Sequence, residues 1–132
     1  SQALRSRTML RVADLRLQQH PLELDVLFQK PVCVDGLQFT AEHGREGWPS
    51  QVGLIRVVYT TLLDPADQAS LMEVDLGVLV VPCVPPGSVL FIDLPNRTEP
   101  TTKVVVKVMR NYGGREARLG KILPYCLLDP EV

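Results

Sequence analysis

The sequence contains few aromatic residues, cysteines and histidines. Aromatic side chains make up 5% of its 132 residues, and there are 3 cysteines and 2 histidines. Three cysteines that lie far apart exclude a disulfide framework and favour a reducing compartment, and the apolar neighbours of Cys83 and Cys126 predict that both thiols are buried. No apolar run approaches the roughly 18 residues that a transmembrane helix needs. We therefore expect a cytoplasmic location, no membrane insertion, and a place for this chain within a larger intracellular protein.

The chain is nearly neutral, with a formal net charge of −1. A near-neutral chain creates no overall field that attracts nucleic acid or an anionic membrane. The charges are nevertheless segregated: residues 61–102 carry six acidic residues and one basic residue, whereas residues 103–121 carry six basic residues and one acidic residue. This pattern is typical of the solvated faces of paired strands. The alternative is a two-signed surface that steers a partner or a second copy of the chain.

Valine and leucine dominate the apolar residues, while 11 prolines and 9 glycines divide the chain into short segments. Residues 22–29 alternate between apolar and polar side chains, which is the period of a strand with one buried face. No long helix separates the predicted strands, so parallel βαβ units are excluded. We predict an all-β fold, an antiparallel β-sandwich of about eight strands with Ig-like, C2-like or jelly-roll topology. A closed β-barrel is the alternative.

One β domain is expected over residues 1–132, because this length is the size of a single domain. Flexible ends are expected at residues 1–7 and 129–132. Besides residues 22–29, strands are predicted at residues 54–62, 73–81, 88–94, 103–110 and 118–128. Residues 8–17 predict either a bulged strand or two short strands.

Two turn signals predict local structure. Asp35-Gly36 is a favoured two-residue turn, which predicts a hairpin between residues 32–34 and 37–40. Asp64-Pro65 is a helix-start signature, because Asp caps the first turn and Pro suits the first helical position. One short helix is therefore expected near residues 64–71.

Catalytic and metal-binding patterns are weak. His20 and His43 flank no recognisable nucleophile motif, and the chain has no CxxC or HxxxH spacing. Residues 78–90 form two apolar segments around a proline and a glycine, and in this strand rhythm they resemble the trimeric dUTPase-like β fold. The Arg-Ser-Gly phosphate loop of that family, and its Asp and Tyr near the uracil, have no counterpart here. A dUTPase-like or other enzyme is therefore the least favoured function, and we expect no cofactor or metal.

The best candidates for partner binding lie in two polar segments. Residues 42–50 contain Arg45 and the single tryptophan, Trp48, and interfaces favour aromatic anchors beside charges. The alternative is that Trp48 folds back as a lid on the core. The second segment is the basic turn around residues 111–118, which contributes the candidates Arg110, Tyr112, Arg115 and Arg118.

A non-catalytic protein–protein interaction or assembly module is the function that these features favour, with another protein or another copy of the chain as partner. The alternative is a nucleic-acid-binding β-barrel that uses the basic segment 103–121, including Lys103 and Lys107. Only Tyr112 and Tyr125 offer that segment aromatic rings on which bases can stack.

Overall fold

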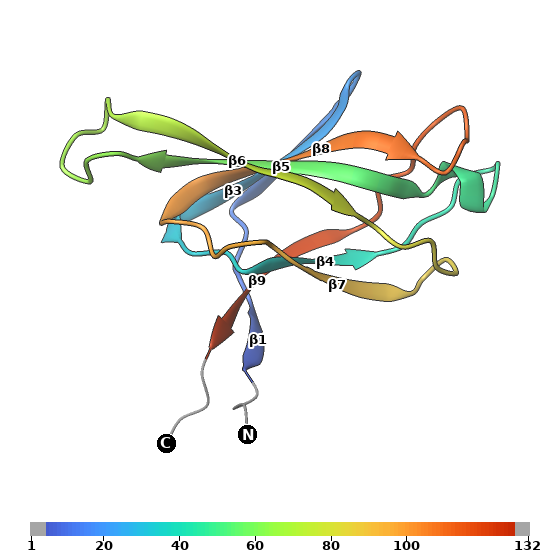
Figure 1. Ribbon diagram of the computed structural model, residues 1–132, viewed down its shortest axis with the longest axis horizontal. Coiled ribbons are helices and arrows are strands. Elements are labelled where there is room, and N and C mark those ends of the chain that lie inside the picture. Colours follow the sequence, from blue (N-terminus) through green and yellow to red (C-terminus); the bar gives the residue numbers. More distant parts are fainter. Residues whose placement is uncertain (1–4, 129–132) are drawn as a thin grey trace.

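The computed structural model describes residues 5–128 and shows two antiparallel β-sheets stacked as the layers of a sandwich (Figure 1). The elements in chain order are β1 (Ser6–Met9), β2 (Asp14–Gln19), β3 (Leu22–Val32), β4 (Gly36–Thr40), the 3-10 helix η1 (Trp48–Ser50), β5 (Val52–Leu62), β6 (Leu71–Val80), β7 (Val89–Asp93), β8 (Thr101–Asn111) and β9 (Ile122–Leu128). The predicted sandwich is confirmed, with nine strands among the described residues.

One sheet has the strand order β1-β9-β4-β7 and the other has the order β2-β3-β8-β5-β6. The outermost strands of each sheet have a single neighbour, so the part of the chain from 5 to 128 forms two open sheets and the barrel alternative is wrong. The flexibility predicted for residues 1–4 and 129–132 falls outside the described residues. Ser6 and Arg7, also expected to be flexible, belong to β1 and pair with β9.

The core lies between the sheets and follows the alternation of the central strands. Leu24, Val26 and Phe28 of β3 are buried, as the pattern of residues 22–29 predicts. Val104 and Val106 of β8 face the same layer and are 0% exposed. Full burial of such a side chain contributes about 1.5–3 kcal/mol to folding. The intervening polar residues of both strands point to the outer face of the sheet.

The ambiguous N-terminal segment forms two short strands. β1 pairs with β9 in the four-stranded sheet, and β2 pairs with β3 in the five-stranded sheet. The alternation breaks near Ala13-Asp14 because the chain crosses from one sheet to the other just before this point. The two-strand form of the prediction is confirmed.

The predicted hairpin at Asp35-Gly36 is wrong, because β3 and β4 belong to different sheets. Asp35 is buried, and its carboxylate accepts hydrogen bonds from Nε and Nη2 of Arg97, at 2.9 and 2.8 Å, and from the backbone N–H of Leu127 at 2.6 Å. The Arg97 guanidinium holds the pKa of the Asp35 carboxyl below its usual range, against the opposing effect of burial. Gly36 lies under Tyr125, whose hydroxyl group occupies the space that a Cβ at Gly36 needs.

The predicted helix at residues 64–71 is also wrong, because this segment is the turn that joins β5 to β6. Its polar side chains bind the nearby backbone: Oδ1 of Asp64 accepts from the N–H of Ala66 at 3.0 Å, and Oγ of Ser70 donates to the carbonyl of Asp67 at 2.6 Å. Such bonds compete with helical ones. The backbone N–H of Leu63 donates to the carbonyl of Ser70, which closes the turn between two paired strands.

Candidate partner-binding site

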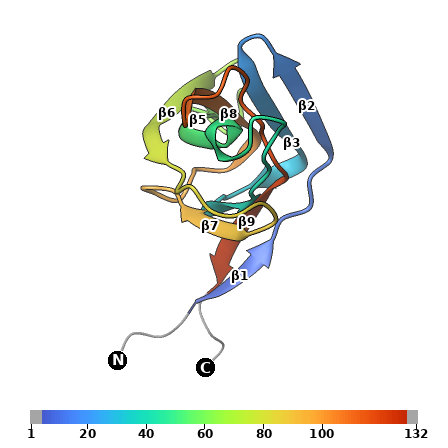
Figure 2. The same ribbon diagram turned by 90° about the vertical axis from the view of Figure 1, so that its right-hand side faces the viewer.

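Two loops that the sequence analysis treated separately lie side by side at one end of the sandwich (Figures 1 and 2). One joins β4 to β5 (residues 41–51) and the other joins β8 to β9 (residues 112–121). We call these residues, together with Arg110 at the adjoining end of β8, the loop end, which is on the right of Figure 1 and faces the viewer in Figure 2. The opposite end holds the β5–β6 turn (residues 63–70) and the β7–β8 connection (residues 94–100), and we call it the hairpin end.

Backbone hydrogen bonds join the two loops of the loop end. The carbonyl of Pro49 accepts from the N–H groups of Tyr112, at 3.1 Å, and Gly114, at 2.9 Å. The N–H of Arg118 donates to the carbonyl of Ser50 at 2.7 Å. Because these bonds connect segments from distant parts of the chain, the position of each loop depends on the other.

Two glycines allow the close approach of the loops. A Cβ at Gly114 would lie 2.9 Å from the carbonyl oxygen of Pro49, so only glycine fits beside this backbone. Gly47 has a φ of 76°, which favours glycine, at the start of η1. Its carbonyl accepts from Oγ of Ser50, which itself accepts from the N–H of Gly44 at 2.7 Å. The loop around η1 is therefore tied both to itself and to its neighbour.

A third segment, between β6 and β7, is bound to the loop end through Gln51. This side chain is 3% exposed; its Nε2 donates to the carbonyl of Pro82 at 2.7 Å, and its Oε1 accepts from the N–H of Val84 at 3.1 Å. His43 lies beside it, with Nε2 3.0 Å from the carbonyl oxygen of Val84. The histidine therefore takes part in the hydrogen bonding that holds the loops.

Trp48 is 59% exposed, so the alternative in which it forms a lid on the core is wrong. The same end presents four exposed arginines: Arg45, Arg110, Arg115 and Arg118. Among residues 5–128, none of these four guanidinium groups forms an ion pair. Five basic residues against three acidic residues, from 41–51 and 110–121, leave this end net positive.

Tyr112 and the backbone of Arg115 have structural contacts. The Tyr112 hydroxyl donates to the carbonyl of Val81, and its ring fills the space in front of Gly53, where a Cβ would lie 3.0 Å from Cε2. The N–H of Arg115 donates to both carboxylate oxygens of Glu46, at 3.0 and 2.9 Å. These contacts fix the second loop and leave the Arg115 guanidinium directed to no acidic partner within the described chain.

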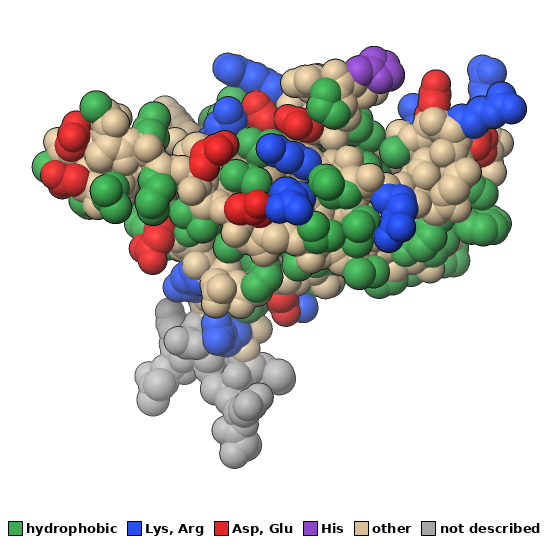
Figure 3. Space-filling model, turned by 45° about the horizontal axis from the view of Figure 1, so that its top comes forward, with side chains coloured by type: hydrophobic (Ala, Val, Ile, Leu, Met, Phe, Trp, Pro, Cys, Tyr) green, Lys and Arg blue, Asp and Glu red, His purple; other side chains and the backbone are tan. Residues whose placement is uncertain are grey.

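Lys103 and Lys107 of the basic segment lie elsewhere, on the outer face of the five-stranded sheet, where both signs of charge alternate (Figure 3). Nζ of Lys103 lies 3.7 Å from Oδ2 of Asp25, and Lys107 is paired across the strands with Glu23. Nη1 of Arg56 lies 2.6 Å from Oδ2 of the exposed Asp75. The structure therefore divides the basic segment in two: Lys103 and Lys107 lie beside acidic residues on the sheet, whereas Lys121 and the arginines lie at the loop end.

A cluster on the outer face of the four-stranded sheet is satisfied internally. The Arg7 guanidinium lies 4.2 Å from the centre of the Phe91 ring, a cation–π distance. Tyr125 is buried beside it, and its hydroxyl donates to Oδ1 of Asp93. Burial, assisted by this carboxylate, raises the pKa of Tyr125 to about 12. These contacts cover the sheet and explain why a tyrosine on an outer face is buried.

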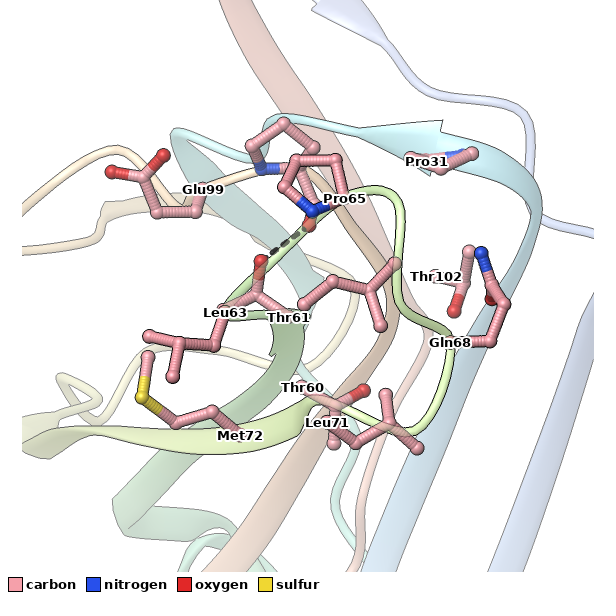
Figure 4. Close-up of a pocket in the computed structure, with 12 residues that line it drawn as sticks. Pro31, Thr60, Thr61, Leu63, Pro65, Gln68, Leu71, Met72, Glu99 and Thr102 are labelled. Atoms are coloured by element: carbon pink, nitrogen blue, oxygen red, sulfur yellow. Dashed lines mark hydrogen bonds between the residues drawn. The ribbon is translucent and has the colours of Figure 1, made fainter.

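A groove of about 580 Å³ lies at the hairpin end, and the sequence analysis did not predict it (Figure 4). Its lining residues come from the end of β3, the end of β5, the β5–β6 turn, the start of β6 and residues 99–102, and include Leu63, Leu71 and Met72. Oγ1 of Thr61 donates to the carbonyl of Pro100 at 2.8 Å, across the groove floor (Figure 4). The only sequence signal was a pair of leucines directly before Asp64-Pro65, where a turn exposes apolar side chains.

Within residues 5–128, no group of three or more His, Cys, Asp or Glu side chains is placed to hold a metal ion. No helix of this part of the chain has the length and apolar character needed to cross a membrane. All three cysteines are free; Cys33 and Cys126 are half-buried, whereas Cys83 is exposed, so the prediction that Cys83 is buried is wrong.

Comparisons with known proteins inform the fold of this chain and not its function. No family model and no curated protein matches the chain. In fold it is similar to part of a two-domain protein of unknown function from Bacteroides fragilis, with a TM-score of 0.59 and 15% identity over 94% of this chain and 37% of that one. A second structure, GH31 CBM32-2 bound to GalNAc, aligns with a TM-score of 0.47 and 10% identity over 93% of this chain and 74% of that one. The chain thus spans 37% of the length of the Bacteroides protein, and this similarity shows a β-sandwich fold.

Proposed function

We propose that this chain is a non-catalytic recognition domain of a larger intracellular protein, and that its loop end binds an acidic, partly apolar segment of another protein. The observation that carries the proposal is an exposed tryptophan on the same fixed loops as arginines that have no acidic partner within residues 5–128. Tryptophan and arginine are the residue types most enriched among those that dominate binding energy at interfaces.

Fixed loops favour tight binding. Because Pro49 and Ser50 are bonded to the second loop, Trp48 sits on a backbone that is already ordered. Binding then loses less conformational freedom than it would with mobile loops. Free guanidinium groups suit carboxylates, since each can form two parallel hydrogen bonds with one carboxylate.

A catalytic role has less support. The groove at the hairpin end is lined by proline, threonine, leucine, methionine and glutamine, and by one carboxylate, that of Glu99. General acid–base chemistry usually combines a base with a second polar group in one pocket. The small cavity beside the loop end, near Arg118, holds only about 10 Å³, too little for a substrate.

The nucleic-acid alternative also has less support. Lys103 and Lys107, which were expected to contact phosphates, lie beside Asp25 and Glu23. Binding a backbone phosphate there requires that the lysine leave its acidic neighbour, and this lowers the gain from counterion release.

The test is selection of binding peptides from a random display library, followed by titration of the enriched peptides. Trp48 is the only tryptophan, so its emission reports binding at the loop end directly. We expect enriched peptides to combine Asp or Glu with an apolar residue. Trp48→Ala, measured by calorimetry because it lacks the fluorophore, should weaken binding about 30-fold, the effect of a truncated hot spot. The double variant Arg115→Glu, Arg118→Glu should weaken it further.

The matched control is Arg16→Glu, which reverses an exposed arginine on the sheet that pairs with Asp14 at 3.0 Å. Peptide affinity should stay within about twofold of the parent, because this side chain lies on β2, away from the loop end. Enriched peptides that bind the Trp48→Ala and double variants as tightly as the parent would refute the proposed function.

A further inference from the structure

The groove at the hairpin end combines apolar walls with an acidic rim. Leu63 is 73% exposed, Leu71 is 67% exposed and Met72 is 41% exposed, and all three line the groove (Figure 4). Isolated exposed leucines are common on protein surfaces, but several around one hollow mark a binding groove. The groove is therefore an exposed apolar surface that an inserted side chain can cover.

The charges around this groove have the sign opposite to that of the loop end. Asp64, Asp67 and Glu99 are exposed, and none of them forms an ion pair within residues 5–128. Two basic residues lie near: Arg97 is bound to Asp35, and Lys30 directly precedes Pro31 of the groove. The hairpin end is net negative, whereas the loop end is net positive.

The size of the groove at the hairpin end also suits the Trp48 side chain of the loop end. An aromatic side chain buries about 150–250 Å² when it is enclosed, and the groove of about 580 Å³ is large enough to admit one. Trp48 begins η1 at the loop end, at the opposite end of the sandwich from the groove, and is not among the residues that line the groove. A contact between the two therefore joins two molecules.

We propose that the loop end of one copy docks on the hairpin end of a second copy, with Trp48 in the groove and the arginines against the acidic rim. This inference rests on the proposed function, since it names a partner for the loop end. The arrangement is head to tail: each copy uses a different surface on each side, so the contacts extend into open chains unless the rotation closes a ring. A small contact of this kind predicts weak association that grows with protein concentration.

Sedimentation equilibrium on the 132-residue chain, from about 10 μM to 1 mM, tests the inference over the affinity range of weak contacts. The average mass of the parent should rise steadily with concentration and fall back at high salt. Trp48→Ala should stay monomeric. So should Leu71→Glu and Glu99→Arg, which change exposed groove residues in two different ways. Val78→Glu, on the same strand but outside the groove, is the matched control and should associate like the parent.

The most direct test of the head-to-tail contact mixes two variants that should not associate on their own. Trp48→Ala keeps an intact groove, and Leu71→Glu keeps an intact tryptophan, so the mixture restores one contact and forms pairs but no longer chains. Its only tryptophan, that of the Leu71→Glu partner, should shift its emission to the blue. A parent that stays monomeric at about 1 mM while enriched peptides still bind at Trp48 overturns the inference and leaves the proposed function standing. Association that survives in both variants also overturns the inference, and the absence of both association and peptide binding overturns the two proposals together.

Discussion

The two ends of the sandwich are held together in different ways. At the loop end, hydrogen bonds join segments that are distant in the sequence, such as Pro49 with Gly114 and Ser50 with Arg118. At the hairpin end, the β5–β6 turn is bonded to itself, with Oγ of Ser70 accepting from Asp64 and donating to Asp67. The loop end is therefore fixed by tertiary structure, and the turn by local contacts.

The groove at the hairpin end has two walls. The β5–β6 turn forms one, and the β7–β8 connection forms the other, which is bound more firmly. Arg97 is bound to Asp35, and Oγ1 of Thr98 accepts from the backbone N–H of Val34 at 2.9 Å. The groove therefore lies between one wall tied to the core and one wall that can adjust. A fixed anchor at one end and an adaptable groove at the other suit the head-to-tail contact, because only one partner needs to rearrange.

The largest loss of stability is expected from Asp35→Ala, which removes the hydrogen bonds between Asp35 and Arg97 of the β7–β8 connection. The variant loses three hydrogen bonds and leaves the N–H of Leu127 and the Arg97 guanidinium without their acceptor, at a cost of about 3 kcal/mol. Urea unfolding followed by far-UV circular dichroism measures this loss. Peptide binding at the loop end should be unchanged under folding conditions, and a variant that loses both equally contradicts the separation of the two ends.

The same pair predicts a pH dependence. The pKa of Asp35 is lowered in the folded protein, so its contribution is present above the unfolded pKa of about 4 and is lost as the pH falls through the lower folded value. The difference in unfolding free energy between the parent and Asp35→Ala should be constant near neutral pH and shrink below about pH 4. A difference that grows on acidification would contradict this assignment.

An intermediate effect is expected from Gly114→Ala at the loop end. The added Cβ meets the carbonyl oxygen of Pro49 at 2.9 Å, so the loops must separate, at about 1–2 kcal/mol. Peptide affinity at Trp48 should fall as well. Asp35→Ala is the control, because it lowers stability by releasing Arg97 at the hairpin end and leaves the Pro49 contact in place. Equal losses of affinity in both variants would show that the Pro49 contact does not set the position of Trp48.

Smaller changes in stability and peptide affinity should distinguish an arginine in an ion pair, Arg56, from one without an ion pair within residues 5–128, Arg118. Arg56→Ala removes an ion pair with Asp75 on the sheet surface and should cost about 0.5 kcal/mol of stability, with no change in peptide affinity. Arg118→Ala should show the reverse, with stability preserved and affinity reduced. Thermal unfolding and Trp48 titration measure the two quantities on the same samples. Identical behaviour of the two variants would remove the distinction between sheet and loop-end charges.

The smallest effect is expected from Ser70→Ala in the adaptable wall. The hydroxyl bonds only to exposed groups of its own turn, so the loss of stability should be about 0.5 kcal/mol. Amide hydrogen exchange should become faster in residues 63–70 and stay unchanged in residues 41–51. Faster exchange at both ends would mean that the turn and the loops are coupled.

The strands were predictable because their signal is local. The alternation of residues 22–29 and 103–110 identifies the buried faces of β3 and β8. The break near Ala13-Asp14 predicts a bulge or two short strands, but not that the two strands belong to different sheets. The pairing of the strands was harder to predict from the sequence. Asp35-Gly36 has the composition of a hairpin turn, but the partner of the Asp35 carboxylate, Arg97, lies far along the chain, and no local pattern indicates it.

The loop end was predicted only in parts. Trp48 and Arg115 were chosen for their residue types, but the sequence does not show that their loops share the carbonyl of Pro49. Backbone hydrogen bonds of this kind have no side-chain signature. The groove was missed because Leu71 was assigned to the predicted helix 64–71, and Met72 fell between that helix and the predicted strand 73–81. The exposure of both side chains depends on how far β5 and β6 extend beyond the other sheet (Figure 1).

The emission of Trp48 during titration with an enriched acidic peptide tests the central claim most directly. If the loop end is the binding site, the emission shifts to the blue and becomes protected from a soluble quencher as the peptide saturates the domain, and the midpoint agrees with the affinity measured by calorimetry. A peptide that binds by calorimetry while Trp48 remains as exposed as in the free protein would contradict the account.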